Sequence, residues 1–490
     1  MLTNIQIDDG ALGRLLEGLQ KLGRECEWVE FKESWDEPED IGEYISALSN
    51  SAAIAGMPQG YLIWGVQDGT LDIVGTTFDP SSKKIGNEEL ENWLSYQVAP
   101  RLNLRFIKFE VDGKPLVLLE VDRAFRHPTR FRNDEFIRVG SYKKKLKEHP
   151  EKEALLWKQF SETPFEDLAA ASDLTAEQVV ELLDIESYYR LNDRPLPGDL
   201  MKSLEALIVD ELIKPETSGR WSVTNLGAVL YARNLDSFRN LGRKVVRIVR
   251  YKGNDRIDSV KEWSISKGYA VGYESAVELV MEQMPSREII ESARRISLPM
   301  VPKVAVREIL ANALIHQDFT VAGAGIMVEI FDTRVEISNP GEPMVDTKRL
   351  LDLPPRSRNE ALASHMRRIG YCEERGSGID RVVSLVEASQ LPAPEFSVPD
   401  GSTKATLFGT RPLKDMDADA RIRACYWHAC LKRVRHEYVT NASLRERFGI
   451  DEKNSATVSR LIKEAVESGF IKPHAENSSN RLKRYVPFWV

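Results

Sequence analysis

The chain has few cysteines, and none are paired at metal-binding spacing. Its 490 residues include only four, Cys26, Cys372, Cys425 and Cys430, and no CxxC motif. Such scattered cysteines favour a reducing cytoplasm over a secreted disulfide framework and argue against a structural zinc site. Cys425, His428 and Cys430 lie close in sequence, but their spacing suits neither a zinc knuckle nor a zinc finger. We therefore expect them to be buried helical side chains.

Long apolar runs, repeats and low-complexity tracts are also absent. No apolar stretch approaches the roughly 20 residues that span a bilayer, and the first residues lack the basic-then-apolar order of a secretory signal. Hydrophobic residues make up 42% of the chain and charged residues 29%, which is typical of globular proteins. We predict a cytoplasmic protein of about three or four domains with no membrane partner.

Negative charge prevails in the chain but not at its C-terminus. The net charge is -8, yet residues 421–490 hold 14 Lys and Arg against 7 Asp and Glu. This segment therefore carries +7, and the preceding 420 residues carry -15. A basic block on an acidic body predicts a nucleic-acid partner for that block.

The most informative motif lies in residues 307–318. Glu308 and Asn312 are four residues apart in a helical pattern, so they share one helix face. Two glycine-bearing segments follow, Ser338-Asn339-Pro340-Gly341 and Glu374-Arg375-Gly376-Ser377-Gly378. Glycines let backbone N–H groups approach a phosphate that a β-carbon would obstruct. Either motif alone arises often by chance, but together and in this order they predict a nucleotide pocket.

This order of parts resembles the GHKL (Bergerat) ATP-binding fold. The divergent form it is similar to occurs in bacterial Schlafen/AlbA-type proteins with an AAA-4, RecG-like C-terminal region. The resemblance implies ATP and Mg²⁺ as cofactors, with Asn312 coordinating the ion and Glu308 activating water. It also assigns the nucleotide-binding residues Asn339, Gly341, Arg375, Gly376, Ser377 and Gly378. Whether ATP is hydrolysed, as by a weak ATPase, stays open.

One position departs from the family pattern. The usual adenine contact is an Asp in a DxGxG loop, and Asn339 stands in the corresponding place. An amide offers both donors and an acceptor. We expect Asn339 to read adenine through its oxygen, but less exclusively than a carboxylate would.

Acidic residues near the N-terminus form a second candidate site. Glu25 and Glu30 have ExxxxE spacing, and Asp68 follows an apolar strand expected at residues 60–66. Lys32 lies two positions beyond Glu30, on the same face of a strand. Carboxylates and a lysine placed like this are typical of metal-dependent nucleases, where the acids hold Mg²⁺ or Mn²⁺ and the lysine stabilises phosphate charge.

Three segments of this region resemble the Schlafen/AlbA domain. The resemblance assigns Glu25, Glu30 and Asp68 as a catalytic and metal-binding triad that cuts nucleic acid, with Lys32 beside it. The alternative is a set of solvated acids at a sheet edge, in a protein that binds nucleic acid without cutting it. The resembling segments are residues 28–34, 47–50 and 60–68.

Two basic surfaces are candidates for nucleic-acid contact. The first is a rim on the N-terminal domain formed by Arg130, Arg132, Arg138 and Lys143, with aromatic residues interleaved; its alternative is solvated loop charge. The second lies in the C-terminal block, where a helix at 443–448, a turn, a helix at 455–468 and a hairpin predict a winged helix-turn-helix. There Arg460 and Lys463 would face a groove, and Arg481, Lys483 and Arg484 would meet phosphates. A winged helix used for protein contact is the alternative.

We therefore predict a multidomain α/β (α+β) protein. Its expected domains are a Schlafen/AlbA-like nucleic-acid-binding domain (1–150), a helical, winged-helix-like connector (151–240), a GHKL-like α/β sandwich (241–414) and a winged helix-turn-helix (415–490). The predicted function is that of an ATP-gated, homo-oligomeric nucleic-acid-binding protein with a metal-dependent endonuclease site, suiting phage defence or stress response. The alternative is a non-cleaving transcriptional regulator that binds DNA through the winged helix. The choice between DNA and RNA stays open.

Overall fold

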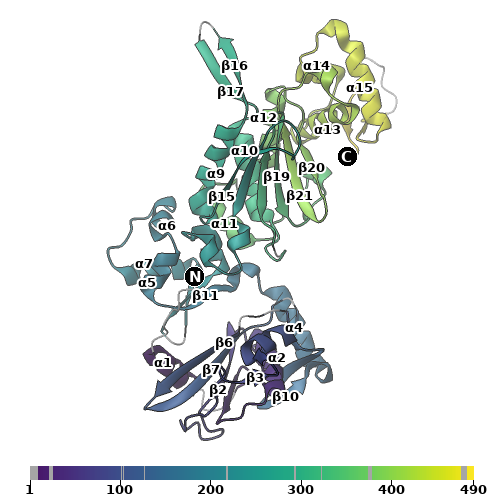
Figure 1. Cartoon of the computed structure of the whole chain (residues 1–490). Coiled ribbons are helices and arrows are strands. Elements are labelled where there is room, and N and C mark those ends of the chain that lie inside the picture. Colours follow the sequence, from purple (N-terminus) through teal and green to yellow (C-terminus); the bar gives the residue numbers. More distant parts are fainter. Residues whose placement is uncertain are drawn as a thin grey trace. The chain divides into compact units, whose positions relative to one another are not determined.

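The computed structural model divides into two compact units (Figure 1). One unit comprises Met1–Thr175 with Lys214–Ser222, and the other Ala176–Ile213 with Val223–Val490. No helix among the described residues is long and apolar enough to cross a membrane. The structure describes residues 9–20, 26–100, 102, 104–125, 127–216, 219–291, 294–321, 323–373, 378–475 and 483–490.

A four-stranded mixed sheet forms the centre of the first unit. Its strands, in spatial order, are β1 (Val29–Lys32), β2 (Gln59–Trp64), β7 (Lys114–Asp122) and β6 (Leu104–Val111). β1 and β2 are parallel, and the other neighbours are antiparallel. Asp112 and Gly113 connect β6 to β7 with φ of 52° and 72°, as in a tight hairpin turn.

Helices cover both faces of this sheet because successive strand residues point to opposite sides. Ile63 packs with apolar residues of α1 (Asp9–Gln20). Leu62 and Trp64 pack instead with α2 (Pro38–Ile54). The alternation along β2 therefore builds two separate cores.

A second sheet packs against α2. In spatial order its strands are β10 (Tyr142–Lys145), β9 (Asp134–Val139), β8 (Arg130–Phe131) and β5 (Val98–Ala99). The buried amide of Asn50 on α2 donates hydrogen bonds of 2.8 Å to the carbonyls of Thr129 and Phe136. These bonds fix the β8–β9 hairpin. The remaining elements are β3 (Lys84–Ile85), β4 (Glu88–Glu89), α3 (Leu90–Gln97) and α4 (Pro150–Glu162).

The charged stretch 143–150 is not a plain linker. Its first residues form β10, which pairs antiparallel with β9. α4 then packs on α2, with Leu156 buried beside Ala53. An edge strand can carry charged side chains because one side of it meets solvent. The polar composition of residues 143–145 is therefore compatible with a strand.

Short helices and a small sheet follow α4. The elements are β11 (Ala169–Leu174), α5 (Ala176–Leu182), α6 (Ile185–Leu191), α7 (Leu200–Val209), β12 (Ile213–Pro215), β13 (Trp221–Thr224) and α8 (Asn225–Tyr231). The strands pair in the order β11-β13-β12. The description of this segment as a winged-helix-like connector stays a prediction, as do the domain limits.

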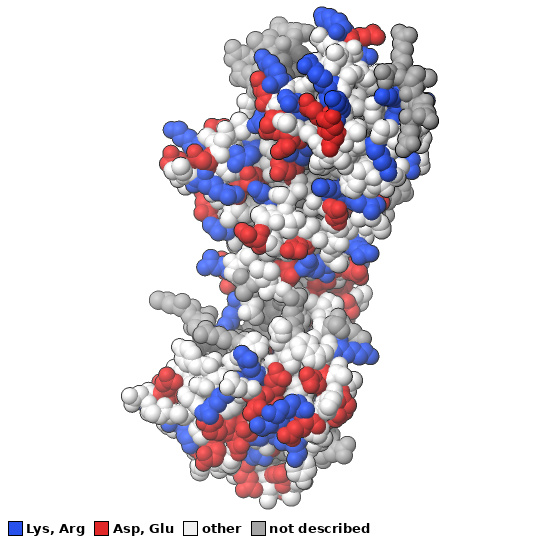
Figure 2. All heavy atoms as spheres, turned by 90° about the vertical axis from the view of Figure 1, so that its right-hand side faces the viewer, with Lys and Arg blue, Asp and Glu red and all other residues white. Residues whose placement is uncertain are grey.

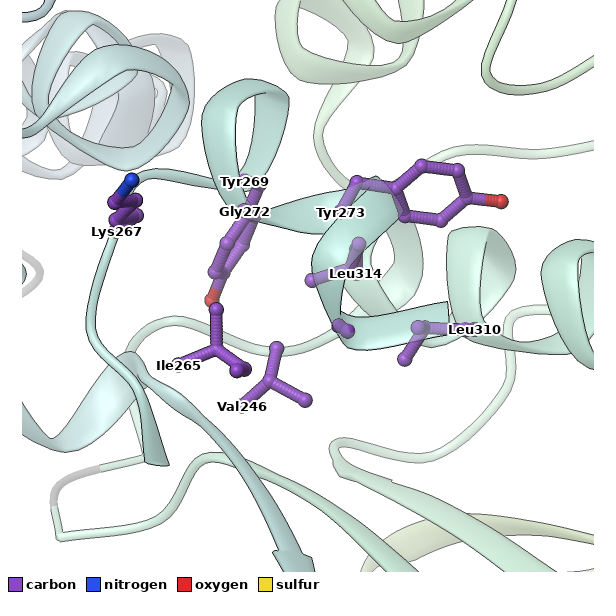
Figure 3. A pocket seen from close by; sticks show the side chains of 9 residues that line it. Val246, Ile265, Lys267, Tyr269, Gly272, Tyr273, Leu310 and Leu314 are labelled. Atoms are coloured by element: carbon purple, nitrogen blue, oxygen red, sulfur yellow. The ribbon is translucent and has the colours of Figure 1, made fainter. Parts of the chain in front are cut away.

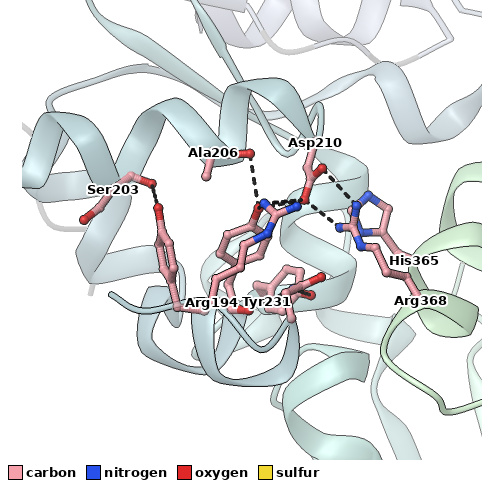
Figure 4. Close-up of polar contacts among 10 residues, drawn as sticks. Arg194, Ser203, Ala206, Asp210, Tyr231, His365 and Arg368 are labelled. Carbon is pink, nitrogen blue, oxygen red and sulfur yellow. Dashed lines mark hydrogen bonds and ion pairs between the residues drawn. The ribbon is translucent and has the colours of Figure 1, made fainter. Parts of the chain in front are cut away.

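Asp210, at the end of α7, is the centre of a polar network in the second unit (Figure 4). Its carboxylate accepts hydrogen bonds from Arg368 at 2.9 and 2.6 Å and from the Tyr188 hydroxyl at 2.6 Å. Arg368 ends α11 (Glu360–Arg368). Burial lowers the pKa of neighbouring His365 to about 4, so this imidazole is neutral and its Nδ1 can accept from Arg368, 2.8 Å away. The network ties α7 to α11.

The second unit contains a six-stranded sheet with helices against one face (Figure 1). In spatial order the strands are β15 (Ser259–Ile265), β14 (Val246–Tyr251), β18 (Ile326–Ile330), β19 (Arg334–Pro340), β21 (Ser402–Phe408) and β20 (Glu395–Ser397). Only β14 and β18 pair in parallel. The helices are α9 (Tyr269–Gln283), α10 (Lys303–His316) and α12 (Gly378–Ala388), and a hairpin of β16 (Ser286–Glu291) and β17 (Arg294–Pro299) follows α9.

The chain ends in three helices and a two-stranded hairpin. These are α13 (Ala418–Val434), α14 (Asn441–Phe448), α15 (Ser455–Glu467), β22 (Ile471–Pro473) and β23 (Tyr485–Pro487). Their order agrees with the sequence-based expectation. The thiols of Cys425 and Cys430 lie in the cores around α13, where burial raises the pKa of each to about 12.

Candidate functional site

Helix α10 presents the acid–amide pair. Leu310 and Leu314 face the sheet and line a small apolar cavity of about 10 Å³ (Figure 3), which is room for about one water molecule. Glu308 and Asn312 each lie two residues from Leu310, which is about 200° around the helix, so they face away from the packed layer. Glu308 is only 8% exposed, and Asn312 is half-buried.

The pair faces the first residue of α12. A β-carbon on Gly378 would lie 2.8 Å from Glu308 Oε2 and 4.0 Å from Asn312 Nδ2. Any other residue would therefore press on the carboxylate. The structure brings together three predicted site residues, Glu308, Asn312 and Gly378, which span 70 positions in the sequence. The predicted loop residues Arg375, Gly376 and Ser377 lie outside the described residues.

Charges around Glu308 suit it to accept a proton. Burial raises the pKa of Glu308, and the neighbouring Glu373 carboxylate raises it further, against the opposing effect of Arg381 and Arg307. Arg381, one turn into α12, lies 2.7 Å from Glu373 and 3.9 Å from Glu308. Its side chain is 51% exposed, so it remains accessible to an anion. A carboxyl group whose pKa is raised toward neutrality is a stronger general base.

A second predicted segment forms the end of β19. Asn339 is 5% exposed, and its Nδ2 donates to the Pro340 carbonyl at 3.1 Å. Among the described residues no donor forms a hydrogen bond with the side-chain oxygen of Asn339, so this oxygen can accept one from a ligand. Gly341 has φ of 99°, and a β-carbon there would lie 2.8 Å from Asp318 Cβ. The turn therefore requires glycine.

Asn339 gives a nucleotide-preference prediction. Its unused oxygen accepts a hydrogen bond from the 6-amino group of adenine but not from the O6 acceptor of guanine. We expect ATP to bind at least about 10-fold more tightly than GTP, since a neutral hydrogen bond is worth about 1 kcal/mol and an unmatched buried acceptor costs about 1–3 kcal/mol. Isothermal titration calorimetry with each nucleotide checks this, and Asn339→Asp should widen the difference. A preference for GTP contradicts the adenine assignment.

Residues missed by sequence reasoning connect the two segments. The Asp318 backbone N–H donates to the Pro340 carbonyl at 2.7 Å, and its carboxylate lies 2.5 Å from Arg358. Asn359 donates to the carbonyl of Ile315 at 2.7 Å, which caps the end of α10. Asp318 ends the motif at residues 307–318, but nothing in the sequence indicated that Arg358 would pair with it or that Asn359 would cap the helix. An open surface cavity of about 370 Å³ lies next to this turn, lined by residues 342–347 and Val398.

The N-terminal acid Glu30 is buried and paired with two cations. One oxygen contacts Lys32 and the other contacts Arg138 in direct ion pairs. Glu30 is 1% exposed and Arg138 is 0% exposed. Glu30 and Lys32 do share a strand face, as predicted. However, both carboxylate oxygens that a metal would need are taken by these cations.

The rest of the predicted triad does not assemble among the described residues. Asp68 lies in an exposed turn beyond β2, and no described hydrogen bond or ion pair joins it to Glu30. Glu25 lies outside the described residues. Within the described ranges no group of three His, Cys, Asp or Glu side chains could hold a metal ion.

The predicted basic rim is largely neutralised. Arg138 is wrong as a nucleic-acid contact because it is buried against Glu30. Lys143 pairs with Asp40 at 2.8 Å and with Glu43 at 2.5 Å, so it is not a free cation, and its role as a phosphate contact stays a prediction. Arg132 pairs with Glu39, whereas Arg130 is exposed. Figure 2 shows the same mixture of signs, with acidic and basic side chains interspersed over the face drawn.

The C-terminal helix α15 has one apolar and one polar side. Val458, Leu461 and Ile462 are buried, whereas Arg460 and Lys463 are exposed. Asn441 on α14 donates to the Ser455 carbonyl at 3.0 Å and holds the start of α15. Lys483 and Arg484 are exposed beside β23, and Arg481 lies outside the described residues.

Comparisons with known proteins identify two parts of the chain. The family model described as "Schlafen, AlbA_2" matches residues 25–147. The model described as "Putative ATP-dependent DNA helicase recG C-terminal" matches residues 323–407, which include Asn339, Gly341 and Gly378 but begin after α10. No curated protein gives a significant match.

Two solved structures are distant likenesses. The crystal structure of the DIP2311 protein from Corynebacterium diphtheriae covers 98% of this chain and 97% of its own, at 16% identity and a TM-score of 0.41. The N-terminal domain of a "Putative ATP-dependent DNA Helicase RecG-related Protein" from Nitrosomonas europaea covers 28% of this chain and 92% of its own, at 22% identity and a TM-score of 0.20.

The fold and the two family matches define a mixed α/β protein with an ATPase-like domain. More particularly, the chain contains a Schlafen/AlbA-type domain at residues 25–147 and a divergent, RecG-related ATPase-like region at residues 323–407.

Proposed function

We propose that this chain is an ATP-gated nucleic-acid-binding protein. The observation that carries the proposal is the closeness of Gly378 to Glu308 and Asn312, since a β-carbon on Gly378 would lie 2.8 Å from the Glu308 carboxylate and 4.0 Å from the Asn312 amide. The start of α12 therefore lies beside the acid–amide pair. This agrees with the GHKL-like arrangement expected from sequence. Backbone N–H groups at a helix start attract anions, so a polyphosphate is the ligand that suits this corner.

The residues present fit ATP with Mg²⁺. Asn312 offers a side-chain oxygen, the kind of ligand Mg²⁺ prefers, and would hold the ion, which neutralises phosphate charge when bound. Glu308 is positioned to take a proton from water, so slow ATP hydrolysis is part of the proposal. Arg381 supplies a positive charge one helical turn from Gly378.

We place the nucleic acid on the C-terminal module, defined as residues 418–490, and interpret it as a winged helix-turn-helix. Its order of helices and hairpin supports this, as does an α15 surface carrying Arg460 and Lys463. Lys463 lies 3.6 Å from Glu467. That pair is exposed, so it is worth little and does not prevent a phosphate contact.

Removing the two basic side chains tests this placement. An Arg460→Ala, Lys463→Ala double variant should bind duplex DNA about 10-fold or more weakly, with a shallower salt dependence, because two phosphate or base contacts are lost. Fluorescence anisotropy titrations at several salt concentrations measure both quantities. Lys414→Ala, an exposed lysine just outside the module, is the control. Equal affinity of the double variant and wild type would locate the nucleic acid elsewhere.

The central experiment combines both ligands. Labelled tRNA, single strands and duplex are incubated with the protein, with and without ATP·Mg²⁺. An affinity for nucleic acid that changes with ATP supports the proposal. An affinity that is the same with and without ATP contradicts control by the nucleotide. The same samples with Mn²⁺ test the second candidate, a metal-dependent nuclease at Glu25, Glu30 and Asp68, which requires Glu30 to leave its cation partners.

A further inference from the structure

A buried polar network joins the far end of α12 to the C-terminal module. Glu387 is the last residue but one of α12. One of its oxygens accepts a hydrogen bond from His428 Nδ1 on α13 at 2.9 Å, and the other lies 3.4 Å from Arg447 Nε on α14. His428 Nε2 lies 3.0 Å from the hydroxyl of Ser443, in the first turn of α14. A single carboxylate therefore holds two helices of the module.

The histidine and the arginine of this network are shielded from solvent, and the Glu387 side chain is 20% exposed. His428 is 3% exposed and Arg447 is 5% exposed, and Arg447 also donates to the Leu391 carbonyl, just beyond α12, at 2.5 Å. Hydrogen bonds to charged groups in such surroundings are not weakened by salt as surface pairs are. Breaking one leaves a buried charge without its partner, which is costly. α12 and the module should therefore move together.

The N-terminal end of α12 lies at the proposed nucleotide site. Gly378 begins the helix against Glu308 and Asn312. Eleven helical residues span about 16 Å, so one rigid element connects the acid–amide pair with the Glu387 network. Apolar packing adds to the link, because Val383 of α12 shares a core with Trp427 and Leu431 of α13.

We propose that α12 transmits nucleotide occupancy to the C-terminal module through the contacts of Glu387 with His428 and Arg447. This rests on the proposed function and names its regulatory element. Nucleotide binding displaces the start of α12, the buried network carries the displacement to α13 and α14, and the affinity of the module for nucleic acid changes. Coupling free energies of this kind usually correspond to about 5- to 150-fold in affinity.

The test is a coupling measurement on the full chain. The affinity for a fluorescent mixed-sequence DNA duplex is measured with and without a non-hydrolysable ATP analogue and Mg²⁺. Wild type should show a ratio of at least about 5, and nucleotide affinity should change by the same factor when DNA is present. Glu387→Gln and His428→Gln should bring both ratios close to one while each ligand alone still binds. Glu437→Gln, the same change at an exposed carboxylate of the module, should leave the ratios unaltered.

Four results would overturn the inference. Variants that keep the wild-type ratio exclude the Glu387 network as the link. A wild type that binds both ligands with a ratio of one excludes coupling but leaves the proposed binding function intact, whereas a wild type that binds no nucleotide overturns both. Hydrogen exchange on wild type requires no variant: ATP analogue should alter the protection of amides in residues 441–448, and unchanged protection also overturns the inference.

Discussion

The free energy of unfolding of an Arg138→Ala variant should be about 3–5 kcal/mol lower than that of wild type. Arg138 and Glu30 are both excluded from solvent and form a direct ion pair. Removing the guanidinium leaves the Glu30 carboxylate in the interior with Lys32 as its one remaining cation. The cost of that poorly compensated charge exceeds what any exposed pair contributes. Urea unfolding followed by circular dichroism measures it.

Two variants serve as controls for this prediction. Lys32→Ala should cost less, because the Lys32 side chain is 23% exposed. Arg132→Ala should change stability by less than about 1 kcal/mol, since Arg132 and its partner Glu39 are half exposed. If Arg138→Ala folds as stably as wild type but loses nucleic-acid binding, Arg138 acts at the surface and the buried pair is not what maintains this domain.

The same pair decides how any nuclease test is interpreted. A Glu30→Ala protein that cuts no RNA could have lost a metal ligand or simply its folded N-terminal domain. Glu30→Gln keeps the shape of the side chain, so activity should be compared among variants only after their unfolding midpoints agree.

An Asn312→Ala variant should lose the Mg²⁺-dependent thermal stabilisation that ATP gives wild type. A ligand at 100 times its Kd stabilises by about 2.7 kcal/mol, and none of this remains if the ion has lost its side-chain oxygen. Gly378→Ala should have a similar effect for a steric reason, because its β-carbon would press on Glu308. Thermal melts with ATP, with and without Mg²⁺, measure both.

Asn240→Ala is the matched control for the nucleotide site. Asn240 is exposed, and it belongs to neither the acid–amide pair nor the Asn339 turn. Its melting temperature should rise with ATP as in wild type. A rise of the same size in Asn312→Ala would exclude that residue as an ion ligand and move the nucleotide away from α10.

Local patterns predicted several elements of this fold. The helical period of α10 and the apolar strand at residues 60–66 each depend on neighbours within a few residues, and both agree with the structure. The order of helices at the C-terminus was also predictable, since Gly449 and Gly469 end α14 and α15 with positive φ. The domain limit near residue 150 stays a prediction, and the charged residues before it form β10, because charge alone does not distinguish a linker from an edge strand.

Partners distant in sequence could not be predicted in this way. Arg138 follows Glu30 by 108 residues, and its periodic basic neighbours suggested a surface rim. Burial of that one guanidinium changes Glu30 from a candidate metal ligand into half of an internal ion pair. Likewise, nothing near Glu387 in the sequence indicates that His428 and Arg447 converge on it.

The sequence by itself determined which kinds of groups this protein has: an acid–amide pair on one helix face, glycines where backbone must come close, and a basic C-terminal end. Those are local properties, set by side-chain period and backbone freedom. Only the tertiary structure decided which charges are buried and with whom they pair, because desolvation depends on everything that packs around a group. That is why the acid–amide pair could be recognised from the sequence and the burial of Glu30 could not.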